Sequence, residues 1–157
     1  MIAILILAVT AMLSLLMMLG WLVQRRAGNA GWVDVVWTFA LGLAGIVYAL
    51  VPAPGMPWPG PRQALVALLV ALWSGRLGLH LWDRTRRGPE DVRYAQFRND
   101  WGAAFQRRMF GFLQIQAAAA ALLAVSFLVA ARNPSSLRVQ DGVALLLFAI
   151  AVAGEAL

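Results

Sequence analysis

The apolar residues of this chain fall into five long runs that are separated by short polar links. The runs cover residues 2–23, 31–51, 63–82, 110–131 and 142–157. A helix that crosses the hydrocarbon core of a bilayer needs about 20 mostly apolar residues, and the first four runs reach that length. The pattern predicts an all-α fold, a polytopic transmembrane helical bundle of about five spans that forms a single domain over residues 1–157.

The fifth run is shorter than the others. From Val143 to Leu157 it would extend about 22 Å as a helix, which is less than the hydrocarbon thickness of about 30 Å. It is either re-entrant or part of a span that continues beyond the chain. We expect the second, because no charge or loop closes the run, and the chain would then be the N-terminal part of a longer domain.

The link between the third and fourth runs is long and patterned. A Gly-Pro pair followed by two acidic residues, at positions 88–91, is typical of a helix start. Phe97, Trp101 and Phe105 then recur at a spacing of four residues, which places them on one helix face. We therefore expect an amphipathic helix over residues 89–108 at the membrane surface, with a solvated loop as the alternative.

Composition supports the membrane assignment and excludes some kinds of site. Apolar residues make up 62% of the chain, charged residues 13%, and the mean hydropathy is +0.75. Such a surface needs lipid as its solvent. Cysteine is absent and His80 is the single histidine, so neither a disulfide framework nor a cysteine or histidine metal cluster can form within the chain.

The charges predict an orientation. All 13 basic residues are arginine and the net charge is +6. Cytoplasmic loops collect basic residues, and topology explains this balance without a nucleic-acid partner. Anionic lipid head groups and a dinucleotide phosphate are two further uses for the arginines. We expect the N-terminus outside and the arginine-rich links in the cytoplasm. The outer links then hold three arginines, and the inner links hold nine: Arg25, Arg26, Arg84, Arg86, Arg87, Arg93, Arg98, Arg107 and Arg108.

Polar residues inside the apolar runs are candidates for function, because they are costly in lipid. Arg76, His80 and Arg84 share one helix face of the third run. Asp34, near the start of the second run, is the expected partner of Arg76 or His80. Two alternatives stay open: a structural ion pair between two helices, or Asp34 as a helix cap near the interface. The buried polar candidates are Asp34, Arg76, His80, Gln116 and Glu155.

Four sequence motifs carry a family resemblance. They are N-A-G-W-V-D-V-V-W at 29–37, L-W-S-G-R-L-G-L-H-L-W-D-R at 72–84, E-D-V-R-Y at 90–94 and Q-I-Q-A at 114–117. In this order and spacing they resemble a bacterial membrane family of unknown function that is related to steroid 5-alpha-reductases. The closing G-E-A-L resembles the start of that family's next motif.

The resemblance implies a helical membrane enzyme, with bacterial inner-membrane location. Relatives of known activity use NADPH to reduce a carbon–carbon double bond conjugated to a carbonyl, and hydride goes to the β-carbon. The resemblance also implies that Arg84, Arg93 and Tyr94 lie on the cofactor side, while Asp34, Trp37, Arg76, Gln116 and Glu155 match other recurring positions.

Two departures limit what the resemblance implies. Relatives carry a C-terminal segment with an R-H-P-N-Y-like motif that supplies most of the NADPH site, and this chain lacks it. Leu81 stands near a tyrosine that contacts the substrate carbonyl in steroid-reducing relatives. We therefore expect the N-terminal portion of an NADPH-dependent reductase of an apolar enone, unable to bind NADPH productively alone. The alternative is a non-enzymatic membrane scaffold or partner subunit.

Overall fold

The computed structural model describes residues 1–52, 55, 58–135 and 137–154. Within these residues the regular elements are all helices, so the all-α prediction is confirmed. Three of them, together with the stretch that contains α5, are long and apolar enough to cross a membrane. The helices are α1 (Ile2–Ala27), α2 (Trp32–Leu50), α3 (Pro61–Arg87), α4 (Val92–Trp101), the 3₁₀ turn η1 (Gly102–Ala104), α5 (Phe105–Ala131) and α6 (Val139–Gly154).

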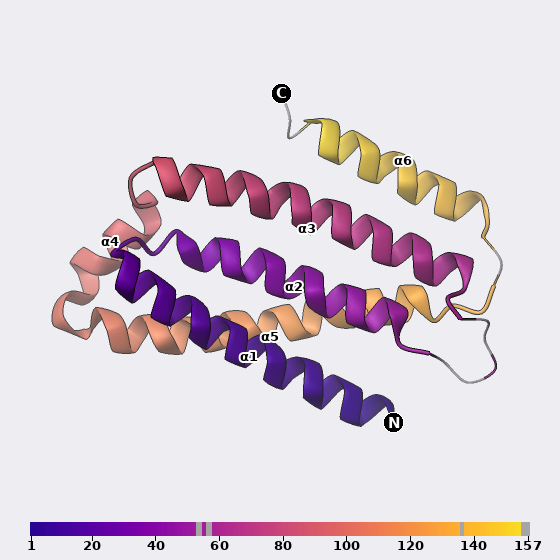
Figure 1. Cartoon of the computed structure of the whole chain (residues 1–157), viewed down its shortest axis with the longest axis horizontal. Coiled ribbons are helices and arrows are strands. Elements are labelled where there is room, and N and C mark those ends of the chain that lie inside the picture. The colour runs from indigo at the N-terminus through magenta and orange to yellow at the C-terminus, as the bar shows by residue number, and fades with distance from the viewer. Residues whose placement is uncertain (53–54, 56–57, 136, 155–157) are drawn as a thin grey trace.

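Helix α2 forms the centre of the bundle. It contacts α1, α3 and α5, and Figure 1 shows it running between α1 and α3. Its core-facing side chains include Leu41, Ala44 and Tyr48, which are at most 3% exposed. An apolar stripe this wide marks a helix surrounded by protein, so α2 is the element that positions the others.

Glycines let α2 and α3 approach closely. A Cβ at Gly42 would lie 2.2 Å from the Oγ of Ser74, and a Cβ at Gly78 would lie 2.5 Å from the ring of Phe39. Small residues at such crossings are typical of helix packing in membranes. The α2–α3 contact therefore depends on the missing side chain at both positions.

The predicted surface helix over residues 89–108 is shorter in the structure. Helix α4 ends at Trp101, because Gly102 adopts a φ of 45° that L-residues rarely adopt. Residues 105–108 belong to α5 instead. In Figure 1, α4 lies across the end of the bundle where α1 and α3 finish.

The aromatic stripe of this segment packs on the protein. Phe97 stacks on Trp101 with ring centroids 4.6 Å apart, and Phe105 is only 3% exposed. Phe97 and Trp101 are partly buried against the main core. The stripe therefore attaches the α4 segment to the bundle.

Helix α6 is the least embedded element. It has 16 residues, and none of its described side chains is buried. Figure 1 shows it alongside α3, to which Arg62 and Asp141 join it by an ion pair. The short fifth run thus forms a helix, but one shorter than the four long apolar stretches.

Candidate functional site

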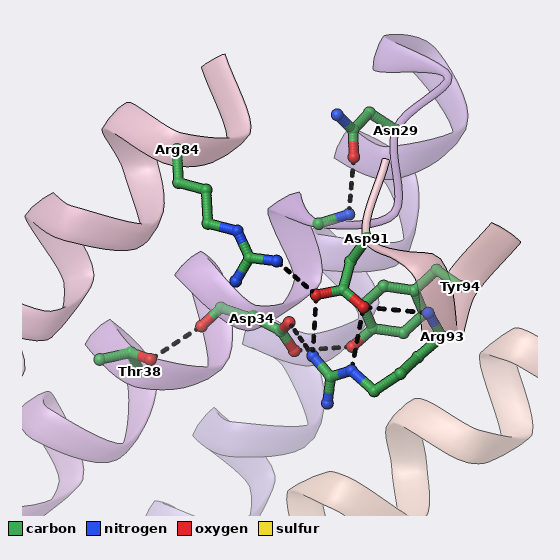
Figure 2. A network of polar contacts seen from close by, with 8 residues as sticks. Asn29, Asp34, Thr38, Arg84, Asp91, Arg93 and Tyr94 are labelled. Atoms are coloured by element: carbon green, nitrogen blue, oxygen red, sulfur yellow. Dashed lines mark hydrogen bonds and ion pairs between the residues drawn. The ribbon is translucent and has the colours of Figure 1, made fainter. Parts of the chain in front are cut away.

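A network of polar side chains from α2, α3 and α4 lies at the arginine-rich end of the bundle. Figure 2 shows Asp34 from α2, Arg84 from α3, and Asp91, Arg93 and Tyr94 from the start of α4 converging on one point. The sequence brings them together because α2 begins, α3 ends and α4 begins at the same end. We call these five residues the polar clasp.

Asp34 is the acceptor at the centre of the polar clasp. Its Oδ1 accepts a hydrogen bond of 2.6 Å from the hydroxyl of Tyr94, and its Oδ2 accepts one of 3.0 Å from Arg93. Tyr94 is 3% exposed. Hydrogen bonds to an ionised carboxylate are stronger than neutral ones, so Asp34 joins α2 firmly to α4.

Asp91 is the second carboxylate of the clasp and the N-cap of α4. It accepts hydrogen bonds from the backbone N–H and the Nε of Arg93, both at 3.0 Å, and from Arg84 at 2.8 Å. Side-chain caps of this kind satisfy a free N–H in the first turn. The hydrogen bond from the Arg93 side chain is the main reason why the pKa of Asp91 lies below its ordinary value, although partial burial opposes the shift.

A second set of contacts holds the α1–α2 loop against the clasp. The N–H of Gly31 donates to the Oδ1 of Asn29, and the N–H of Ala30 donates to Glu90, both at 2.8 Å. Glu90 also accepts from Arg98 at 2.8 Å. Partial burial alone would raise the pKa of Glu90, but the hydrogen bonds from Arg98 and Ala30 outweigh it and the pKa is lowered.

A small pocket opens beside the clasp. Its volume is about 240 Å³, and its lining combines Asp34, Arg93 and Tyr94 with Gln116 from α5 and the ring of Phe97. Ligand pockets for whole drug-sized molecules start at about 300 Å³. This pocket therefore suits one end of a larger ligand.

A larger apolar pocket lies farther along the bundle. It measures about 550 Å³ and is lined by residues of α2, α3, α5 and α6, among them Trp37, Trp73 and Phe148. The indole N–H of Trp37 donates to the backbone carbonyl of Gln116 at 3.4 Å. Trp37 lines the apolar pocket and Gln116 lines the polar one, so this contact connects the two.

Four of the residues singled out from the sequence meet at the polar pocket: Asp34, Arg93, Tyr94 and Gln116. Arg84 belongs to the clasp through its hydrogen bond to Asp91, but it does not line this pocket. Glu155 lies outside the described residues. The sequence analysis predicts Asp91 only as part of a helix start. Its position between Arg84 and Arg93 in the sequence was a signal for the ion pairs that it forms.

The expected pairing of Asp34 with Arg76 or His80 is wrong. Within the described residues the carboxylate of Asp34 binds Tyr94 and Arg93. Asp34 lines a small cleft with Leu81, so Arg76 lies more than one helical turn deeper in the bundle. His80 is exposed, and no contact between His80 and Asp34 occurs among the described residues.

The charges of the clasp balance one another. Asp34 and Asp91 carry two negative charges, and Arg84 and Arg93 carry two positive charges. Among the described residues no group of three or more metal-binding side chains occurs. The clasp can hold a polar group by hydrogen bonds, and within it the Tyr94 hydroxyl donates to Asp34 at 2.6 Å.

Comparison with known families gives a match that spans most of the chain. The family model described as "Protein of unknown function (DUF1295)" matches residues 20–157. The chain belongs to this family. The DUF1295 match covers every residue of the polar clasp and of both pockets described above. No curated protein and no solved structure matches the chain.

Proposed function

We propose that this membrane-embedded DUF1295 protein forms the substrate-side part of a reductase that reduces an apolar enone with NADPH. The observation that supports the proposal is the contact of Trp37 with Gln116, which sets a polar pocket next to an apolar one. A reductase of this kind needs both environments. Its substrate is apolar and its cofactor is polar. We further propose that the arginine-rich end faces the cytoplasm of a bacterium, where NADPH is available.

On this proposal the polar pocket receives one end of NADPH. Its volume of about 240 Å³ is too small for a dinucleotide, and Arg93, which lines it, is already paired with Asp34 and Asp91. NADPH supplies a hydride to the β-carbon of the enone. On this proposal Arg84, Arg93 and Tyr94 lie on the cofactor side, while Asp34 orients Tyr94 through their hydrogen bond.

Saturation-transfer NMR on the purified chain in detergent tests this proposal. With NADPH as the probe, the nicotinamide protons should receive saturation and the adenine protons should not. The binding should be weak, because the pocket accepts one end only. Absence of transfer to any NADPH proton would overturn the proposal, and so would tight binding of the whole dinucleotide.

A matched pair of α4 variants makes this test specific. Gln96 lines the polar pocket and Asn99 does not, and both are exposed on α4. Gln96→Trp should fill the pocket and abolish transfer to the nicotinamide protons. Asn99→Trp should leave it unchanged. Equal signals from both variants would show that NADPH contacts another surface.

The balanced charges of the clasp favour a second candidate function. A cluster of two arginines and two carboxylates can have a purely structural role and hold helices together. That role is expected for a non-enzymatic scaffold or partner subunit. In that case Tyr94→Phe would lower the melting temperature, and no enone or NADPH signal would respond to any variant at the pocket.

A further inference from the structure

A third pocket lies between α1, α2 and α3, apart from the two pockets described above. It measures about 760 Å³, and its lining is apolar apart from one charged residue, Arg26. Val36 and Leu43 of α2 form part of the lining together with Leu19 of α1. Leu19 and Leu43 are 50% and 43% exposed. The pocket is therefore an open groove on the bundle surface, and we call it the α1–α3 groove.

One end of the α1–α3 groove has the features of a membrane interface. Trp32 and Trp82 line it there, and their rings meet edge to face with centroids 5.1 Å apart. Tryptophan gathers at the level of the lipid head groups. Arg26 belongs to the last turn of α1, so it lies at the same end as the two rings.

The charge of Arg26 is available to a ligand. Among the described residues no carboxylate pairs with it, whereas Arg84 and Arg93 pair with Asp91, and Arg98 pairs with Glu90. The preceding Arg25 is turned away and lies over the ring of Trp21 at 4.5 Å.

We propose that the α1–α3 groove binds one anionic phospholipid from the leaflet at the arginine-rich end. Its phosphate lies at Arg26 beside the two tryptophans, and an acyl chain follows the apolar lining along Val36 toward Leu43. The groove offers apolar surface along its length and one uncompensated positive charge at its end. That distribution matches a lipid with a charged head and an apolar tail, and a transmembrane helix from a partner would leave Arg26 without a counter-charge.

Native mass spectrometry of the full chain in detergent tests the proposal. The probes are phosphatidylglycerol, which is anionic, and phosphatidylcholine, which is zwitterionic, with matched acyl chains. We expect one phosphatidylglycerol to remain bound under conditions that remove phosphatidylcholine. Equal retention of the two lipids would overturn the proposal.

Two substitutions separate the head-group contact from the acyl-chain contact. Arg26→Ala should weaken retention of phosphatidylglycerol about fivefold, the ratio that corresponds to about 1 kcal/mol for a basic residue at an anionic surface. Leu43→Trp should lower retention of both lipids by filling the groove. The controls are Arg108→Ala and Ile115→Trp, which change exposed residues of α5 outside the groove.

Two results would overturn the proposal through these variants. One is undiminished phosphatidylglycerol retention in Arg26→Ala, provided that this variant melts like the wild type. The other is a stable dimer without bound lipid that Leu43→Trp dissociates, because a second copy of the chain would then occupy the groove.

Discussion

Tyr94 and Tyr48 are both buried tyrosines, but only one of them has a partner for its hydroxyl. Tyr94 donates to Asp34 at 2.6 Å. The hydroxyl of Tyr48 has no hydrogen-bond partner among the described residues. A buried hydroxyl stabilises a fold only when it is hydrogen-bonded, so the two side chains should respond differently to the same change.

We predict that Tyr94→Phe lowers the free energy of unfolding by about 1.5–3 kcal/mol, the usual effect of losing a hydrogen bond to a charged group. The control, Tyr48→Phe, should be neutral or slightly stabilising. Thermal melting of both variants in the same detergent measures the difference. If both substitutions lower the melting temperature equally, the contact between Tyr94 and Asp34 is not what holds α4.

Acidification should also weaken the contacts of Asp91 in the clasp and of Glu90 beside it. The pKa values of Glu90 and Asp91 lie below their ordinary values of 4.5 and 3.8. A carboxyl group with a depressed pKa in the folded state contributes stability above its ordinary pKa, and that stability is lost as the pH falls through its folded value.

We therefore expect the melting temperature to be steady from neutral pH down to the ordinary pKa of Glu90, and to fall below it. Asp91→Asn should lower the melting temperature at neutral pH and reduce the further loss on acidification. Melting curves across this range measure both effects. An unchanged acid loss in Asp91→Asn would assign the effect to other carboxyl groups.

The close contact between α2 and α3 depends on glycine, which has no side chain. A Cβ at Gly42 would lie 2.2 Å from the Oγ and 2.4 Å from the Cβ of Ser74, which is too near the α3 backbone to be avoided by a rotamer change. A Cβ at Gly75 would meet nothing within 4 Å.

We predict that Gly42→Ala destabilises the bundle by about 2 kcal/mol through overpacking. Gly75→Ala should be neutral or stabilising, because alanine favours helix by up to about 1 kcal/mol over glycine. Chemical or thermal unfolding in detergent compares them. A neutral Gly42→Ala would mean that α2 and α3 can move apart without loss.

The helices themselves were largely predictable from the sequence, because each follows a long apolar run. Their exact ends were less so. The run before Arg25 gave a span ending at residue 23, whereas α1 continues to Ala27. The end of α4 depends on the positive φ of Gly102. Glycine is a known signal for a helix end, but the aromatic spacing from Phe97 to Phe105 continues through it and favours one longer helix.

The candidate site was predictable in its members more than in its contacts. Asp34 and Gln116 stand out because polar residues in apolar runs are costly, and both line the polar pocket. The partner of Asp34 could not be derived, because helix-face reasoning compares positions within one helix. Positions within one helix do not indicate that α4 folds back over the start of α2 and brings Tyr94 to Asp34.

For the whole molecule, the uneven distribution of arginines predicts an orientation that can be measured directly. The chain has no cysteine, so single cysteines can be introduced without interference. Asn99 is exposed on α4, and Asn133 is exposed between α5 and α6 at the opposite end of the bundle.

We expect a membrane-impermeant thiol reagent to label Asn133→Cys in intact bacterial cells. Asn99→Cys should be labelled only after the cells are permeabilised, because the arginine-rich end is predicted to face the cytoplasm. The reverse labelling pattern would show that the N-terminus is inside.

The contact between Asp34 and Tyr94 joins positions that are 60 residues apart, and this separation has a consequence for biosynthesis. When α2 leaves the ribosome, its acidic residue has no partner yet. At about 5–20 residues per second, the ribosome needs several more seconds to deliver Tyr94. During that interval Asp34 must stay hydrated, so the final seating of α2 in the lipid is expected to wait for the synthesis of α4.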